Sequence, residues 1–157
     1  MLFRSVRSAR TKTVGSMAIM EWLIAPSVSG DIPEAKTLTK EIDRAFSGEL
    51  DLLSAVKQRS AAYRLFDIPE PQVELVSESS VESTIIEVRS HDRIGLLFEV
   101  ASAIAGVSVD IRAAVVSTLG AEAIDTLYLQ DSDSKALSRD HAFEVVEHVA
   151  TALRRMK

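Results

Sequence analysis

The residue types best suited to chemistry in this chain gather in one segment, His91-Asp-Arg-Ile-Gly-Leu-Leu97, which connects a predicted strand to a predicted helix. The first turn of a helix carries unpaired N–H groups and the positive end of the helix dipole, so a ligand carboxylate could dock there. Gly95 would let the backbone approach that ligand closely, and Asp92 could meet its amino group. In the alternative structural interpretation, Asp92 only caps the helix and Gly95 only eases a tight turn.

Metal chemistry is a weaker interpretation of the histidines. His91-Asp92 is the dipeptide at the centre of metal-dependent HD phosphohydrolases, but such sites need further His and Asp ligands from several helices, and this chain has three histidines. His141 and His148, with Glu144 between them, could also clasp a metal from one helix face. A solvated face of mixed charge explains that spacing better. We therefore expect no metal and no cofactor.

Other catalytic motifs are missing from the sequence. It contains no G-x-S-x-G, no P-loop and no G-x-G-x-x-G. It has no cysteine, which excludes thiol chemistry and disulfides and permits a cytoplasmic location. The carboxylates of Asp140, Glu144 and Glu147 are typical of a helix surface. We expect no active site in this chain.

Composition limits the classes of partner. The chain has 157 residues, of which 46% are apolar, and a net charge of −5. A packed globular core is therefore expected. The acidic balance disfavours nucleic acid and anionic membranes, which require clustered Lys and Arg. No apolar run approaches the roughly 20 residues of a membrane-spanning helix, so we expect neither nucleic acid nor a membrane as partner.

The elements that would position the His91–Leu97 segment follow from periodicity. Thr84 to Ser90 is short and rich in β-branched residues, as in a buried strand. A helix is predicted at Leu96 to Ala105, then two strands at Val109 to Thr118 and Ala121 to Gln130, then a helix capped by Ser138. The expected apolar stripes are Leu97, Val100, Ala101 and Ile104 on the first helix, and Phe143, Val146, Val149, Ala150 and Leu153 on the second.

An internal repeat organises the chain. Val6 to Ile19 aligns without gaps over Ile111 to Ile124, with six identical positions. The matched pairs are Arg7 with Arg112, Ala9 with Ala114, Thr13 with Thr118, Gly15 with Gly120, Ala18 with Ala123 and Ile19 with Ile124. Each window precedes a second strand-like run, a polar loop and an amphipathic helix, so the order of elements repeats too.

The first copy is expected to be incomplete. It is predicted to form strands at Phe3 to Thr13 and Met17 to Ala25, then helices from about Glu34 to Phe46 and from about Leu50 to Arg64. Counterparts of the opening strand and helix of the second copy would fall before Met1. Gln72 to Val76 predicts an edge strand, and the copy that it joins is left open. The expected organisation is a truncated repeat with an extra helix at 1–66, a linker at 67–83 and a complete unit at 84–157.

The βαββα order and these residues resemble the ACT domain, a ferredoxin-like ligand-sensing module of the α+β class. The resemblance covers Thr84 to about Leu153 and, more weakly, Val6 to Phe46. Three stretches are similar to the C-terminal tandem ACT region of bacterial PII uridylyltransferases. They are E-V-R-S-H-D-R-I-G-L-L-F at Glu87 to Phe98, the segment Val109 to Asp125, and W-L-I-A-P at Trp22 to Pro26.

This resemblance implies a regulatory module of nitrogen metabolism that binds an amino acid, glutamine by analogy, and allosterically biases catalytic domains upstream. The chain itself is then not an enzyme, because the catalytic domains are absent from it. The implied ligand site is the loop at Asp92, Arg93, Ile94, Gly95 and Leu96, facing the second strand near Asp110 and Ile111 of a neighbouring ACT unit. The family's loop usually has proline where this chain has Ile94, which reduces the preorganisation expected here.

Two other classes of function stay open. ACT units commonly pair side by side, and a copy that lacks its central strand would expose backbone groups that invite pairing. The chain could therefore be an interaction protein that oligomerises and binds no ligand. An enzyme that uses His91-Asp92 and a metal is the third possibility.

Overall fold

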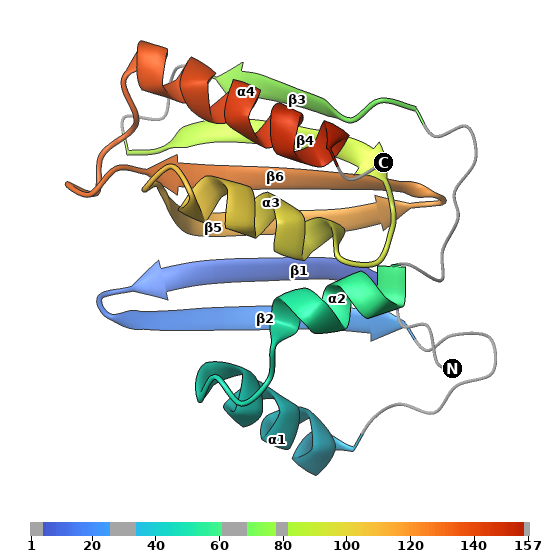
Figure 1. Cartoon of the computed structure of the whole chain (residues 1–157). Helices are drawn as coiled ribbons and strands as arrows, with labels where there is room; N and C mark the ends of the chain where they lie inside the picture. The colour runs from blue at the N-terminus through green and yellow to red at the C-terminus, as the bar shows by residue number, and fades with distance from the viewer. Residues whose placement is uncertain (1–4, 26–33, 61–68, 78–81, 156–157) are drawn as a thin grey trace.

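The computed structural model describes residues 5–25, 34–60, 69–77 and 82–155. They form six strands and four helices, which confirms the predicted α+β class. The elements in chain order are β1 (Ser5–Val14), β2 (Met17–Ala25), α1 (Ala35–Phe46), α2 (Leu52–Ser60), β3 (Gln72–Ser77), β4 (Thr84–His91), α3 (Leu96–Ala105), β5 (Asp110–Leu119), β6 (Glu122–Gln130) and α4 (Arg139–Arg154). The strands make one antiparallel sheet in the order β2-β1-β5-β6-β4-β3 (Figure 1).

The second half of the chain forms the predicted βαββα unit. Strands β4, β5 and β6 are neighbours in the sheet, and α3 and α4 lie together on one of its faces (Figure 1). The helix α4 begins as expected, because the side chain of Ser138 accepts a hydrogen bond from the backbone N–H of His141. Both predicted helices and all three strands are present, with ends shifted by at most a residue or two.

The strand β3 joins this unit, at its outer edge. Its residues pair antiparallel with β4, from Gln72 opposite Arg89 to Ser77 opposite Ile85. The helix α4 packs over it. The edge strand predicted at Gln72 to Val76 is therefore confirmed. The sequence left open which copy it joins, and the structure shows that it joins the second. The order β5-β6-β4-β3 with two helices on one face is the ferredoxin-like arrangement.

The core lies between this part of the sheet and the two helices. Its fully buried members include Ile86, Val88, Leu96, Val100, Ile104, Leu129, Val145 and Val149. The expected helix stripes were partly wrong: Ala101 and Phe143 are exposed, whereas Leu96, Ala103, Ala142 and Val145 are buried. Periodicity locates a stripe to within about one position. The packing of α3 against α4 and β5, and of α4 against β3, decides which position faces inward.

The two halves of the repeat have the same backbone pairing. In the hairpin β1–β2, Thr11 faces Met20; at equivalent positions of β5–β6, Val116 faces Asp125. Each hairpin has a register shift at the same place, between Val6 and Ser8 in one and between Ile111 and Ala113 in the other. Both two-residue turns begin with a glycine of positive φ, +59° at Gly15 and +65° at Gly120. The hairpins β1–β2 and β5–β6 are therefore structurally equivalent.

The copies also pair with each other. The strand β1 lies antiparallel to β5, with Ser8 opposite Ser117 and Lys12 opposite Ala113. In the repeat alignment Ser8 corresponds to Ala113, and Lys12 corresponds to Ser117. Replacing each residue by its counterpart therefore turns one of these pairs into the other. A local pseudo-two-fold axis thus passes through the β1–β5 junction. The hydroxyl of Thr118 strengthens this junction by donating to the carbonyl oxygen of Val6 at 3.0 Å.

The helices of the first half pack less closely. Neither α1 nor α2 has a buried residue. The predicted ends of the first strand at Phe3 and of the extra helix at Arg64 lie outside the described residues. Apolar side chains of β2 remain exposed, including Met17 at 62% and Leu23 at 63%. No helix among the described residues is long and apolar enough to cross a bilayer.

Candidate functional site

The turn between β4 and α3 has the geometry that the sequence predicted. The N–H of Asp92 donates to the carbonyl oxygen of Ala121 at 2.8 Å, which ties the turn to the β5–β6 hairpin. Gly95 then takes φ +88°, a left-handed conformation, and α3 starts at Leu96. Gly95, not Asp92, is the N-cap residue of α3, so the alternative in which Asp92 is the N-cap is wrong. The tight-turn role of Gly95 is confirmed.

The first turn of α3 leaves donors available. The first backbone bonds of the helix are Leu96 N–H to Arg93 and Glu99 N–H to Gly95. The N–H groups of Leu97 and Phe98 have no acceptor among the described residues. Together with the helix dipole, these two donors can bind a carboxylate.

The charged group of Arg93 is directed at Glu99 of α3. Both terminal nitrogens of its guanidinium contact the two carboxylate oxygens of Glu99, one of them at 2.6 Å. The side chains are 16% and 8% exposed, so this bidentate pair is largely removed from water. The ion pair joins Arg93 of the loop to Glu99 in the first turn of α3. Arg93 therefore positions the loop, and its charge is already neutralised.

The helix α2 touches the turn from outside. A Cβ placed on Gly95 would lie 2.4 Å from Cγ1 of Val56, far inside van der Waals contact. Glycine is required at this position for two reasons, its backbone conformation and its contact with α2. The extra helix of the first half thus covers the turn of the second half (Figure 1).

Asp110 and Ile111 lie elsewhere in this chain. Asp110 is exposed at the start of β5, opposite Gln130, whereas the turn lies at the end of the sheet where His91 faces Glu122. The structure brings Asp92, Arg93, Ile94, Gly95 and Leu96 together, and it does not bring Asp110 or Ile111 to them. At the neighbouring copy, the repeat counterparts of these two residues are Ser5 and Val6, and Val6 lies at the correct end, beside Thr118.

Sequence reasoning missed Asp125. This residue of β6 is 1% exposed, and neither of its carboxylate oxygens has a hydrogen-bond partner among the described residues. Burial, and secondarily the charge of Asp92, raise the pKa of Asp125 to about 7. The alternation of side chains along a strand could have predicted its burial. Asp125 shares one face of β6 with the core residues Ala123, Leu127 and Leu129.

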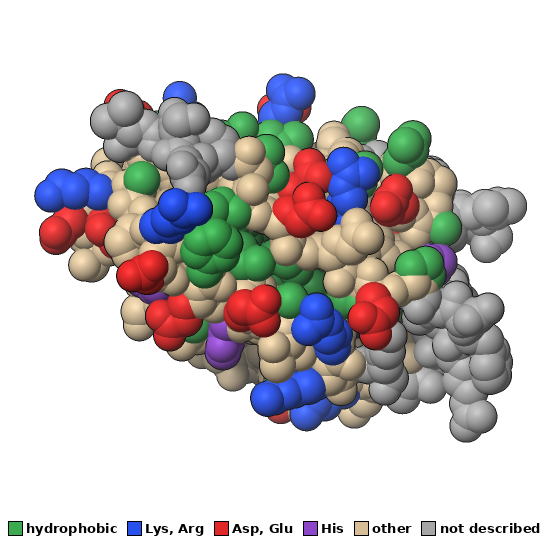
Figure 2. Space-filling model, turned by 90° about the horizontal axis from the view of Figure 1, so that it is seen from above, with side chains coloured by type: hydrophobic (Ala, Val, Ile, Leu, Met, Phe, Trp, Pro, Cys, Tyr) green, Lys and Arg blue, Asp and Glu red, His purple; other side chains and the backbone are tan. Residues whose placement is uncertain are grey.

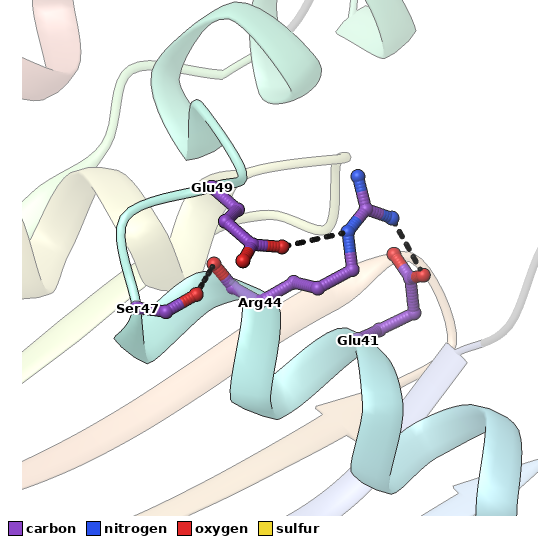
Figure 3. Close-up of polar contacts among 4 residues, drawn as sticks. All are labelled: Glu41, Arg44, Ser47 and Glu49. Carbon is purple, nitrogen blue, oxygen red and sulfur yellow. Dashed lines mark hydrogen bonds and ion pairs between the residues drawn. The ribbon is translucent and has the colours of Figure 1, made fainter.

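Other surfaces offer weaker sites. A hollow of ≈ 640 Å³ runs along α1, but there Arg44 pairs with Glu41 at 2.9 Å and approaches Glu49 at 3.9 Å (Figure 3). The hydroxyl of Ser47 donates to the carbonyl of Arg44 in the same view. Within the described residues, no three His, Asp or Glu side chains are grouped to hold a metal. Charges of both signs are interspersed on the face shown in Figure 2.

Comparison with known proteins identifies relatives for most of the chain. It is 34% identical over 160 residues to the bifunctional uridylyltransferase/uridylyl-removing enzyme of Streptomyces coelicolor, an alignment that covers 96% of this chain and 19% of the relative. The proteins of the same name from Azospirillum brasilense and Gluconobacter oxydans are 35% and 34% identical, over 66% and 57% of this chain. No family model and no solved structure matches the chain.

These relatives are much longer proteins. The chain spans about one fifth of the first relative and 11% and 10% of the other two. It is therefore homologous to a limited part of bifunctional uridylyltransferase/uridylyl-removing enzymes, as the sequence motifs indicated.

Proposed function

We propose that this chain is a regulatory, non-catalytic part of a bifunctional uridylyltransferase/uridylyl-removing enzyme, and that it binds a free amino acid, glutamine in the first instance. The proposal places the chain in the C-terminal tandem ACT region of that enzyme. Homology to a small share of much longer relatives supports the first statement. Three features support amino-acid binding: the β4–α3 turn, the paired repeats and the acidic residues beside the turn.

The observation that carries amino-acid binding is the start of α3. The N–H groups of Leu97 and Phe98 are unpaired within the described residues, and Gly95 presents backbone without a side chain. A ligand carboxylate would bind these donors. The half-buried Asp92 at the same turn would attract a ligand ammonium group. An α-amino acid carries both charges within one small molecule.

The paired repeats support a regulatory role. A ligand at the turn contacts a loop that α2 of the first half already touches through Val56. Binding at the turn can therefore alter how α2 packs, and α2 lies between the two halves along the chain. Such a route transmits occupancy of the second unit to the first.

Calorimetric titration of the purified chain tests this function. L-Glutamine should give a saturable binding isotherm with about one site per chain. D-Glutamine should bind more weakly, because with its ammonium and carboxylate on the same partners its side chain points in a different direction. The matched control is 4-carbamoylbutanoate (glutaramate), which is glutamine without the ammonium group. If no common amino acid gives a saturable isotherm, the sensing function is rejected.

The exposed strand β2 favours a second candidate function, self-association. Its outer edge has no partner strand among the described residues, and six of its apolar side chains are at least 39% exposed: Met17, Ile19, Met20, Trp22, Leu23 and Ile24. Open edges with apolar side chains promote pairing between chains. Sedimentation velocity separates the candidates, because an interaction module would associate without any ligand, and Leu23→Lys would reduce that association.

A further inference from the structure

The binding site proposed at the β4–α3 turn does not explain why Asp125 of β6 is a buried carboxylate. It lies in a row of directly paired residues that crosses all six strands: Trp22, Ala9, Val116, Asp125, Val88 and Val73. Residues paired in this way share one face of the sheet, and here it is the face that α3 and α4 cover. Asp125 is thus one carboxylate among apolar neighbours.

Among the described residues, no hydrogen-bond partner compensates for this placement. The flanking residues on β4 and β5 are the buried valines Val88 and Val116. The buried residues of α4 are apolar, and Arg93 and Glu99 of the turn and α3 neutralise each other. Asp92 is acidic as well, and it raises the pKa of Asp125 further. A buried carboxyl group without partners is costly in either protonation state.

The repeat shows that the fold does not need a carboxylate at this position. The equivalent residue of the first copy is Met20, opposite Thr11 as Asp125 is opposite Val116. The same hairpin, with the same register shift and the same glycine turn, therefore forms around an apolar residue. The carboxylate of Asp125 distinguishes the copy that carries the β4–α3 turn.

We propose that Asp125 is the residue that recognises the ammonium group of the ligand, together with Asp92, while the first turn of α3 binds the ligand carboxylate. This inference rests on the proposed amino-acid-binding function and assigns its specificity. A primary ammonium has three donors, which two carboxylates can accept together. Because Asp125 is 1% exposed, binding would require its surroundings to rearrange, including the turn at Gly95 that Val56 of α2 contacts.

Binding is then coupled to proton release. The folded-state pKa of Asp125 is about 7, so the carboxyl group is about half protonated at neutral pH. A ligand ammonium favours the ionised form, so binding at pH 7 should release about 0.5 proton per ligand. Binding to exposed backbone donors alone would release none from this group.

The test is titration of the full chain with L-glutamine at pH 7 in phosphate and in Tris, whose ionisation enthalpies differ. Wild type should show proton release, and Asp125→Asn should bind about 10- to 100-fold more weakly, with that release lost. The control is Glu144→Gln, which removes an exposed carboxylate of α4 and should behave as wild type. N-acetyl-L-glutamine, which has no ammonium group, should not bind, and magnesium chloride should not compete.

The outcomes separate this inference from the function on which it rests. If wild type binds glutamine and Asp125→Asn binds it equally well, the role of Asp125 is refuted while amino-acid sensing stands. Equal binding of the N-acetyl compound refutes it in the same way. If wild type gives no isotherm while its thermal unfolding is cooperative, the sensing function fails and this assignment fails with it.

Discussion

Arg10 and Val115 lie directly opposite each other where β1 pairs with β5. They are also counterparts in the sequence repeat, Arg10 in the first copy and Val115 in the second. A residue that pairs with its own counterpart marks a local two-fold axis. Two similar hairpins have therefore joined edge to edge in the isologous manner of a homodimer, but within one chain. One consequence is a continuous sheet that links the first half to the second unit.

The first prediction tests this junction. Thr11 lies inside β1, between Met20 of β2 and Ala114 of β5. Thr11→Pro removes a backbone N–H and fixes φ, so one backbone hydrogen bond of β1 to a neighbouring strand should be lost and its acceptor left unpaired. The free energy of local opening should fall by about 1–3 kcal/mol. Hydrogen exchange should show lost protection in β1 and β2 and retained protection in β4 and β6. Thr11→Val is the control, and uniform loss throughout the sheet would contradict a separable second unit.

The second prediction concerns pH. Burial raises the folded-state pKa of Asp125 from 3.8 to about 7, so between these values the folded chain binds a proton that the unfolded chain has lost. Stability should fall as pH rises through this window and should not recover above it. The unfolding free energy of Asp125→Asn, relative to wild type, should therefore increase by about 2–3 kcal/mol from pH 5 to pH 8.

Urea denaturation at a series of pH values measures this difference. Glu144→Gln, at an exposed position, should give a difference that does not change with pH. A flat difference for Asp125→Asn would mean that its carboxyl group titrates normally in the folded chain.

The third prediction addresses the contact between Gly95 and Val56. Alanine at position 95 must adopt φ +88° and must also displace Cγ1 of Val56. The backbone strain should cost about 1–2 kcal/mol, and the steric clash should add to it. In a double-mutant cycle, Val56→Ala should recover the steric part and leave the backbone part. Additive effects of the two substitutions would show that α2 does not pack on the turn in solution.

The fourth prediction compares two ion pairs. Arg93→Ala leaves Glu99, 8% exposed, without its partner and should destabilise the chain by about 2–4 kcal/mol. Arg44→Ala removes a pair with Glu41 whose side chains are 39% and 49% exposed, and it should cost less than about 1 kcal/mol. Chemical denaturation measures both. Replacement of both Arg93 and Glu99 by methionine should restore much of the loss, because no buried charge then remains unpaired.

Much of the fold followed from the sequence because local patterns specified it. The β-branched run at Thr84 and the cap at Ser138 each predicted an element that the structure contains. The repeat predicted that the two hairpins are equivalent, and their shared register confirms it. The start of a helix at Leu96, after a turn at Gly95, was likewise a local matter of backbone conformation.

Only the tertiary structure decided what these elements face. The strand β3 could have joined either copy, and its choice of β4 depends on packing against α4, which is distant in the sequence. The contact of Val56 with Gly95 and the isolation of Asp125 among apolar neighbours also arise between segments far apart along the chain. Periodicity fixes the face on which a side chain lies, whereas the environment of that face is set by whichever elements cover it. A carboxylate on the buried face of β6 could therefore be located from the sequence. That it has no hydrogen-bond partner among the described residues could be seen only in the assembled sheet and helices.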